Sequence, residues 1–142
     1  QPLPGLTRER GDPMEVLSGR VIIAPTDFQR SVAFYRDTLG LQIYREFGAD
    51  GHQTGVVFFL GGGYLELSAS GTTSAMGSTT LWMQVPDVEV EHTRLAALGV
   101  EIVDPPAQMP WGLIEMWARD PDGHRLCLVE VPPDHPIRRR LD

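Results

Sequence analysis

The chain repeats itself once with a period of about 60 residues, and this repeat constrains the fold more than any other feature of the sequence. Three pairs of landmarks share the period: Asp27 and Asp87 lie 60 residues apart, Leu39-Gly40 and Leu98-Gly99 lie 59 apart, and Glu66 and Cys127 lie 61 apart. Coincidence is the alternative, because a strand, an Asp, a helix and a Gly follow one another in many proteins. A single repeat of this length indicates a duplicated domain rather than a solenoid.

The first half reads as a strand, a helix and three further strands. The β-branched run at 20–24 predicts the first strand. Asp27 is a suitable N-cap, and Gly40 a suitable end, for a helix between them. The apolar positions of that helix recur at helical spacing: Phe28, Val32, Tyr35 and Leu39. Strands are expected at 42–47, 54–60 and 64–69, with turns at 49–51 and 61–63.

The second half repeats the order. We expect a strand at 80–85, a helix at 88–98 capped by Asp87 and ended by Gly99, and strands at 100–103, 113–119 and 125–131. The turn between the last two strands is Asp120-Pro-Asp-Gly. The predicted fold class is therefore α+β, built from two βαβββ repeats.

Length and composition predict one globular domain with short extensions. The 142 residues are 42% apolar and 22% charged, which is ordinary for a folded domain. Residues 1–18, with three prolines and two glycines, are expected to form an irregular arm, and 133–142 a C-terminal tail. The domain itself is expected to span 19–132, with halves at about 19–70 and 79–132 joined by a stretch rich in Ser, Thr and Gly.

Charge and cysteine content exclude several partners. A net charge of −7 is wrong for a nucleic-acid binder and would be repelled by an anionic membrane. No apolar run approaches the length needed to span a bilayer. Cys127 is the only cysteine, so no intrachain disulfide can form. We expect the protein in a reducing compartment, the cytoplasm.

Four segments together resemble the vicinal oxygen chelate superfamily, which includes glyoxalase I, bleomycin-resistance proteins and extradiol dioxygenases. They are 26–40, Tyr64-Leu-Glu-Leu67, Pro110-Trp-Gly112 and 120–130, and with the repeat they cover about 19–131. The resemblance implies that the two βαβββ units form a curved, barrel-like mixed sheet with helices outside. It also implies a ligand cavity, a homodimer, and in many members a divalent metal such as Mn, Fe, Ni, Zn or Mg.

The resemblance places the metal ligands at four strand positions, and most of these hold unsuitable residues here. The positions are Arg20 and Thr80, each seven residues before a capping Asp, and Glu66 and Cys127 in the last strand of each half. Arg20 has no lone pair to donate, Thr80 is a poor ligand, and one Cys beside one Glu is an unconvincing set. We therefore predict no metal and no other cofactor, with Glu66 the only plausible ligand if a divalent metal does bind.

Strand alternation groups the candidate ligand-binding residues. They are Arg20, Tyr64, Glu66, Thr80, Trp82, Gln84, Trp111 and Cys127. Aromatic walls with a few polar groups are typical of small-molecule sites. Arg20 and Glu66 are expected to pair across the cavity or to orient a ligand; the alternative is a salt bridge inside a filled core. Trp111 can stack on a planar ligand, or else plug a hydrophobic gap or contact a second copy.

Two functions remain open. The first is a metal-free protein that binds and sequesters a planar or hydrophobic small molecule, as bleomycin-resistance proteins do with their drug, with antibiotic resistance as the outcome. An acidic chain suits a cationic ligand. The second is an enzyme of the superfamily, a dioxygenase, isomerase or lyase, with an atypical or absent metal and Glu66 as general base or remaining ligand. The family alone does not decide between them.

Overall fold

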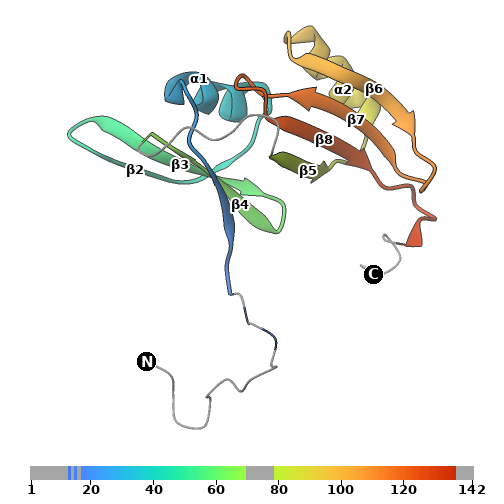
Figure 1. Cartoon of the computed structure of the whole chain (residues 1–142), viewed down its shortest axis with the longest axis horizontal. Helices are drawn as coiled ribbons and strands as arrows, with labels where there is room; N and C mark the ends of the chain where they lie inside the picture. Colours follow the sequence, from blue (N-terminus) through green and yellow to red (C-terminus); the bar gives the residue numbers. More distant parts are fainter. Residues whose placement is uncertain (1–12, 14, 16, 70–78, 137–142) are drawn as a thin grey trace.

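The computed structural model describes residues 13, 15, 17–69 and 79–136, and it has two βαβββ halves (Figure 1). The first half contains β1 (Arg20–Ile23), α1 (Phe28–Ala33), the π-helical turn η1 (Phe34–Thr38), β2 (Ile43–Ala49), β3 (His52–Leu60) and β4 (Gly63–Ser68). The second contains β5 (Thr80–Gln84), α2 (Val88–Ala97), β6 (Glu101–Gln108), β7 (Ile114–Arg119) and β8 (Arg125–Glu130). The arm expected at 1–18, the stretch joining the halves and the end of the tail lie largely outside the described residues.

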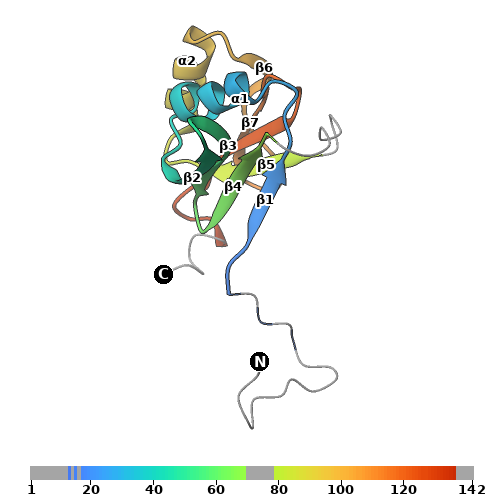
Figure 2. The same cartoon turned by 90° about the vertical axis from the view of Figure 1, so that its left-hand side faces the viewer.

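Each half contributes one four-stranded mixed sheet, so the predicted α+β duplication is confirmed. The strand orders are β1-β4-β3-β2 and β5-β8-β7-β6, and they match position for position. The first strand of each half pairs in parallel with the last, and the remaining pairs are antiparallel. The two sheets are separate, and neither closes into a barrel. In Figure 1, α1 lies above the strands of the first sheet and α2 lies behind β6 and β7 of the second. Figure 2 shows the molecule turned by 90°, with α1 above β3 and β4.

Both helices begin where the sequence predicts. The Asp27 side chain accepts a hydrogen bond from the backbone N–H of Arg30, and Asp87 accepts from those of Glu89 and Val90. The first helix differs from the prediction because its second part, η1, is a π-helical turn. The wider turn accompanies the burial of two adjacent rings, Phe34 and Tyr35, whose centroids lie 5.2 Å apart in an edge-to-face contact.

The strand β6 is longer than predicted, because it continues through Pro105 and Pro106 to Gln108 instead of ending at Val103. Proline cannot donate a ladder hydrogen bond and is tolerated in a sheet at an edge or a bulge. Both conditions hold, since β6 is the edge strand of its sheet and its pairing with β7 shifts register twice.

The larger of two buried hydrophobic clusters in the described part of the chain joins the two halves on the helix side of the sheets. Its fully buried members come from both halves and include Ile23, Val32, Tyr35, Phe58, Leu65, Leu81, Leu95, Met116 and Leu126. Burial of this much apolar surface is the main stabilising contribution. No helix in the described part of the chain is long and apolar enough to cross a membrane.

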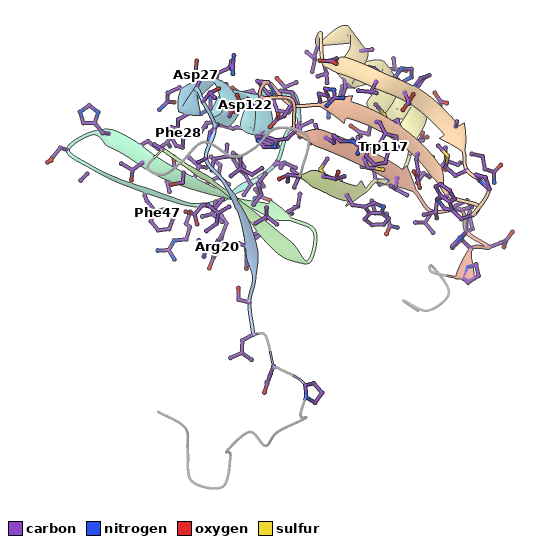
Figure 3. The ribbon with its side chains drawn as sticks, in the orientation of Figure 1. Arg20, Asp27, Phe28, Phe47, Trp117 and Asp122 are labelled. Atoms are coloured by element: carbon purple, nitrogen blue, oxygen red, sulfur yellow. The ribbon has the colours of Figure 1, made fainter. Side chains whose placement is uncertain are left out.

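Polar contacts also connect the halves at two places. The turn between β7 and β8 reaches α1, where the Asp122 carboxylate accepts hydrogen bonds from the Thr26 backbone N–H, the Thr26 hydroxyl and the Arg30 guanidinium (Figure 3). In the same turn, Asp120 accepts a 2.8 Å hydrogen bond from the buried Tyr35 hydroxyl. On α2, the Arg94 guanidinium donates to the backbone carbonyls at the end of η1.

Candidate functional site

Each sheet has one face packed against the core and one face turned away from it, which we call the open face. Burial alternates along the strands: Leu65 and Leu67 of β4 are fully buried, whereas Tyr64 and Glu66 between them are partly exposed. In β5 the same alternation buries Leu81 and leaves Trp82 49% exposed. The strand alternation expected from the sequence therefore places the candidate residues of both strands on open faces.

The open face of the first sheet carries an ion pair. Arg20 Nη1 lies 2.6 Å from Glu66 Oε1, and the two side chains are 32% and 17% exposed. They stand on adjacent strands, because β1 pairs in parallel with β4 and Ile22 is the partner of Glu66. The pair therefore forms along one sheet and not across a cavity, and its partial exposure distinguishes it from a salt bridge in a filled core.

An aromatic cluster stands next to this pair. The Tyr44 and Tyr64 rings stack with their centroids 4.8 Å apart, and the Phe59 ring lies 5.1 Å from Tyr44 and 5.8 Å from Tyr64. Only Tyr64 was predicted from the sequence. The pairing of Phe59 with Tyr64 depends on the register of β3 and β4, and Tyr44 lies at a register shift of β2, so neither position can be read from the sequence alone.

The open face of the second sheet carries a row of side chains across three strands. Cys127 of β8 pairs with Trp82 of β5 on one side and with Trp117 of β7 on the other. Thr80 and Gln84 flank Trp82 on the same face of β5. The Arg125 guanidinium covers Trp117, 4.4 Å from the ring centroid, so that this ring is already engaged in a cation–π contact.

Glu115 also belongs to this open face, which settles the orientation of β7. The side chain is only 6% exposed. Its Oε2 accepts a 2.7 Å hydrogen bond from the Trp111 indole N–H, and its Oε1 lies 3.9 Å from the Cys127 sulfur. Burial, and next the negative charge of Glu115, raise the pKa of the Cys127 thiol to about 12. In the sequence, this contact between Trp111 and Glu115 is indicated only by their spacing of four residues.

The loop that carries Trp111 is held from the C-terminal side. Gly112 has φ of 95°, a conformation that favours glycine, and it lets the chain turn after the tryptophan. A nitrogen of the His135 ring lies 2.9 Å from the Trp111 carbonyl oxygen. The Trp111 ring itself remains 57% exposed while its N–H is hydrogen bonded to Glu115.

A cavity of about 520 Å³ opens between the two halves. Its walls are mostly apolar and include Leu39, Phe59 and Leu60 from the first half and Trp82, Leu95 and Leu128 from the second. Of the predicted site residues, only Trp82 and Gln84 line it. The charged residues in its wall, Glu91 and Arg94, pair with each other.

The structure thus brings the predicted residues together in two groups. Arg20, Tyr64 and Glu66 share the first open face, and Thr80, Trp82, Gln84 and Cys127 share the second, with Trp111 at its edge. Figure 3 shows Arg20 and Trp117 on separate sheets. Within the described residues of one chain, the two groups do not enclose a single pocket.

The positions at which the sequence resemblance implies a divalent metal do not provide a suitable donor set. The Glu66 carboxylate is engaged by a guanidinium, which repels cations and has no lone pair to donate. Cys127 would add a single soft sulfur donor, which does not match the hard carboxylate of Glu66. Within the described residues, no group of three or more His, Cys, Asp or Glu side chains could hold a metal ion.

Comparisons of the sequence and of the structure with known proteins point to the same family. The model of the Glyoxalase/Bleomycin resistance protein/Dioxygenase superfamily matches residues 18–128. TioX from Micromonospora sp. ML1 is similar in structure, with 26% identity, a TM-score of 0.68, and coverage of 81% of this chain and 98% of TioX. Lactoylglutathione lyase from Agrobacterium tumefaciens (22% identity, TM-score 0.64, coverage 84% and 96%) shares the fold. A superfamily member from Sphaerobacter thermophilus DSM 20745 also shares the fold, with 23% identity, a TM-score of 0.65, and coverage of 83% of this chain and 99% of that protein. No curated protein matches the sequence.

Proposed function

Since the chain belongs to the glyoxalase/bleomycin resistance protein/dioxygenase superfamily, we propose that it is a metal-free binding protein that sequesters a planar, hydrophobic small molecule. The observation that carries the proposal is the aromatic content of the open faces. Tyr44, Phe59, Trp82 and Trp111 are all exposed there, although large apolar side chains are normally buried. Exposed aromatic rings supply stacking surface for a planar compound.

We further propose that a second copy of the chain covers the open faces. One chain leaves its two open faces separate, and each would then be completed by the unlike half of the partner in a symmetric homodimer. The exposed apolar side chains of these faces suit burial in such an interface. The ligand would be enclosed between Arg20, Tyr64 and Glu66 of one protomer and Trp82, Gln84 and Trp111 of its partner.

The chemistry of the polar residues supports binding over catalysis. The Arg20 guanidinium occupies an oxygen of the Glu66 carboxylate in an ion pair, so that this oxygen is engaged and not free to take a proton from a substrate. A binding protein needs only shape and stacking, and sequestration of a drug would make the chain an antibiotic-resistance protein. We propose the cytoplasm as its compartment, because its one cysteine, Cys127, is a free thiol.

Calorimetric titration with a panel of planar aromatic compounds tests the proposal. We expect at least one compound to bind, and the W82A variant to bind it about tenfold more weakly because stacking area is lost. The V90A variant, which alters an exposed apolar residue of α2 away from the open faces, serves as the matched control and should bind like the wild type.

Two further measurements complete the test. Elemental analysis of protein never exposed to chelators should give far less than one Mn, Fe, Ni, Zn or Mg per chain, and sedimentation should give the mass of a dimer. Stoichiometric metal would refute the metal-free assignment. A panel that binds equally well to the wild type and W82A would refute the role of the open face.

A further inference from the structure

Glu115 differs from the other buried carboxylates, Asp120 and Asp122, because its hydrogen-bond partners in the described part of the chain include neither a cation nor a backbone N–H group. Glu66 pairs with Arg20, and Asp122 pairs with Arg30. Asp120 accepts from the Tyr35 hydroxyl and from two backbone N–H groups. In the described part of the chain, Glu115 contacts only an indole N–H and a thiol, both neutral.

This arrangement is costly unless something compensates the charge. Removing a carboxylate from water without a cation or several hydrogen bonds is strongly unfavourable. Oε1 has only a weak thiol donor at 3.9 Å, so it retains acceptor capacity for a stronger donor. The surroundings are apolar, since Leu113, Val129 and Val131 form a buried cluster with Cys127 on this face. In such surroundings a charge interaction is stronger than in water.

The nearest exposed ring is suited to a positive charge as well. Trp111 is fixed against Glu115 by its N–H, and more than half of its surface faces solvent. A cation above a tryptophan ring is attracted by the ring quadrupole. The Glu115 carboxylate and the adjacent Trp111 ring therefore both favour a cation, and neither favours an anion.

We propose that Glu115 and Trp111 form a subsite for the cationic group of the ligand, so that the protein prefers planar compounds that carry an amine. The inference rests on the proposed binding function and assigns its charge selectivity. The ammonium group donates hydrogen bonds to Glu115, lies against Trp111, and leaves the planar part of the compound to contact Trp82. The net charge of −7 favours the approach of such a compound.

In the described part of the chain, the cations of this open face, Arg119 and Arg125, lie at the end away from Glu115 and do not fill the subsite. Arg125 lies four residues before Val129, the strand partner of Glu115, which corresponds to about 13 Å along β8. Its guanidinium is stacked on Trp117. The face therefore has a cationic end at Arg125 and an anionic end at Glu115, and this polarity orients a ligand that is charged at one end.

The test compares 1-naphthylmethylamine, an ammonium ion at pH 7, with 1-naphthylmethanol, which has nearly the same shape and no charge. Calorimetry with the full chain should show that the amine binds at least about tenfold more tightly than the alcohol. In the E115Q variant, which keeps an acceptor for the Trp111 N–H, the affinity for the amine should fall about tenfold and that for the alcohol should change less than twofold. E89Q, which neutralises an exposed carboxylate of α2 away from the open faces, is the matched control and should keep the wild-type preference.

The outcomes separate this inference from the proposed function. Equal binding of the two compounds to the wild type, or a preference that survives in E115Q, overturns the cation subsite and leaves the binding function standing. Failure of both compounds and of the planar panel to bind overturns both. The comparison on the wild type needs no variant, so it decides the matter even if E115Q does not fold.

Discussion

The contact between Asp122 and the start of α1 gives a quantitative prediction about how the two halves hold together. Asp122 is buried, and its carboxylate accepts from the Thr26 N–H, the Thr26 hydroxyl and Arg30 Nη2. Each of the two bonds from Thr26 contributes about 1 kcal/mol, and Arg30, which is half exposed, contributes up to about 1 kcal/mol after solvent screening. We expect the D122A variant to lose about 3 kcal/mol of the free energy of unfolding.

Urea denaturation, followed by circular dichroism at one fixed protein concentration, measures this loss. A loss of about 3 kcal/mol corresponds to a fall of the midpoint by about 1.5 M at an ordinary slope, or of Tm by about 6–12 °C. D122N keeps one acceptor oxygen and should lose about half as much. D37N is the matched control: Asp37 is exposed and pairs only with its neighbour Arg36, so it should stay within about 0.5 kcal/mol of the wild type.

A loss below about 1 kcal/mol in D122A would contradict the reasoning. It would mean that the shared apolar core alone joins the halves and that the turn between β7 and β8 merely rests on α1. A change in the slope of the denaturation curve, with little change in its midpoint, would instead indicate that the halves unfold separately.

Three more predictions follow from buried or pinned groups. Burial and the charge of Asp120 raise the pKa of the Tyr35 hydroxyl. The free energy of unfolding should therefore fall by about 1.4 kcal/mol per pH unit above about pH 10, where the phenol ionises in the unfolded chain only. Tm measured at pH 9 and pH 11 checks this, and the Y35F variant should lack the fall. With a pKa of about 12, Cys127 is almost all thiol at pH 8, and iodoacetamide should label it about a thousandfold more slowly in native than in urea-unfolded protein; equal rates would mean an open, ionised thiol. R94A should lower the free energy of unfolding by about 1–2 kcal/mol, because the carbonyls of Thr38 and Leu39 lose their donor. R45A on the open face should change the free energy of unfolding little.

Much of the fold can be predicted from the sequence because its signals are local. A capping Asp, a helical spacing of apolar residues and a terminal Gly each act within a few residues, and their repetition at about 60 residues predicts the duplication. The structure confirms the caps Asp27 and Asp87 and the order of elements in both halves. The sequence does not predict the extension of β6, because prolines such as those at 105 and 106 usually end a strand. Proline is excluded only where a backbone N–H must be hydrogen bonded, and an edge strand such as β6 does not require this.

The candidate site is less predictable because it depends on contacts between distant positions. The turn at Asp120-Pro-Asp-Gly is visible in the sequence, but its contact with Thr26, 96 residues away from Asp122, is not. Glu115 looks like an ordinary strand residue until the Trp111 loop folds back over it. The side of β7 that it occupies follows from the pairing of Trp117 with Cys127, and register cannot be deduced from one sequence.

The main apolar core lies on the helix side of both sheets, and the aromatic and charged side chains discussed above lie on the other side, where the second sheet adds one small buried cluster around Cys127. Stability and recognition therefore depend on largely different sets of residues within the same strands. Alternate positions of one strand can change independently, so substitutions that alter the chosen compound need not endanger folding. For protein engineering, the scaffold offers two adjacent surfaces whose side chains can be exchanged while the interior is left untouched.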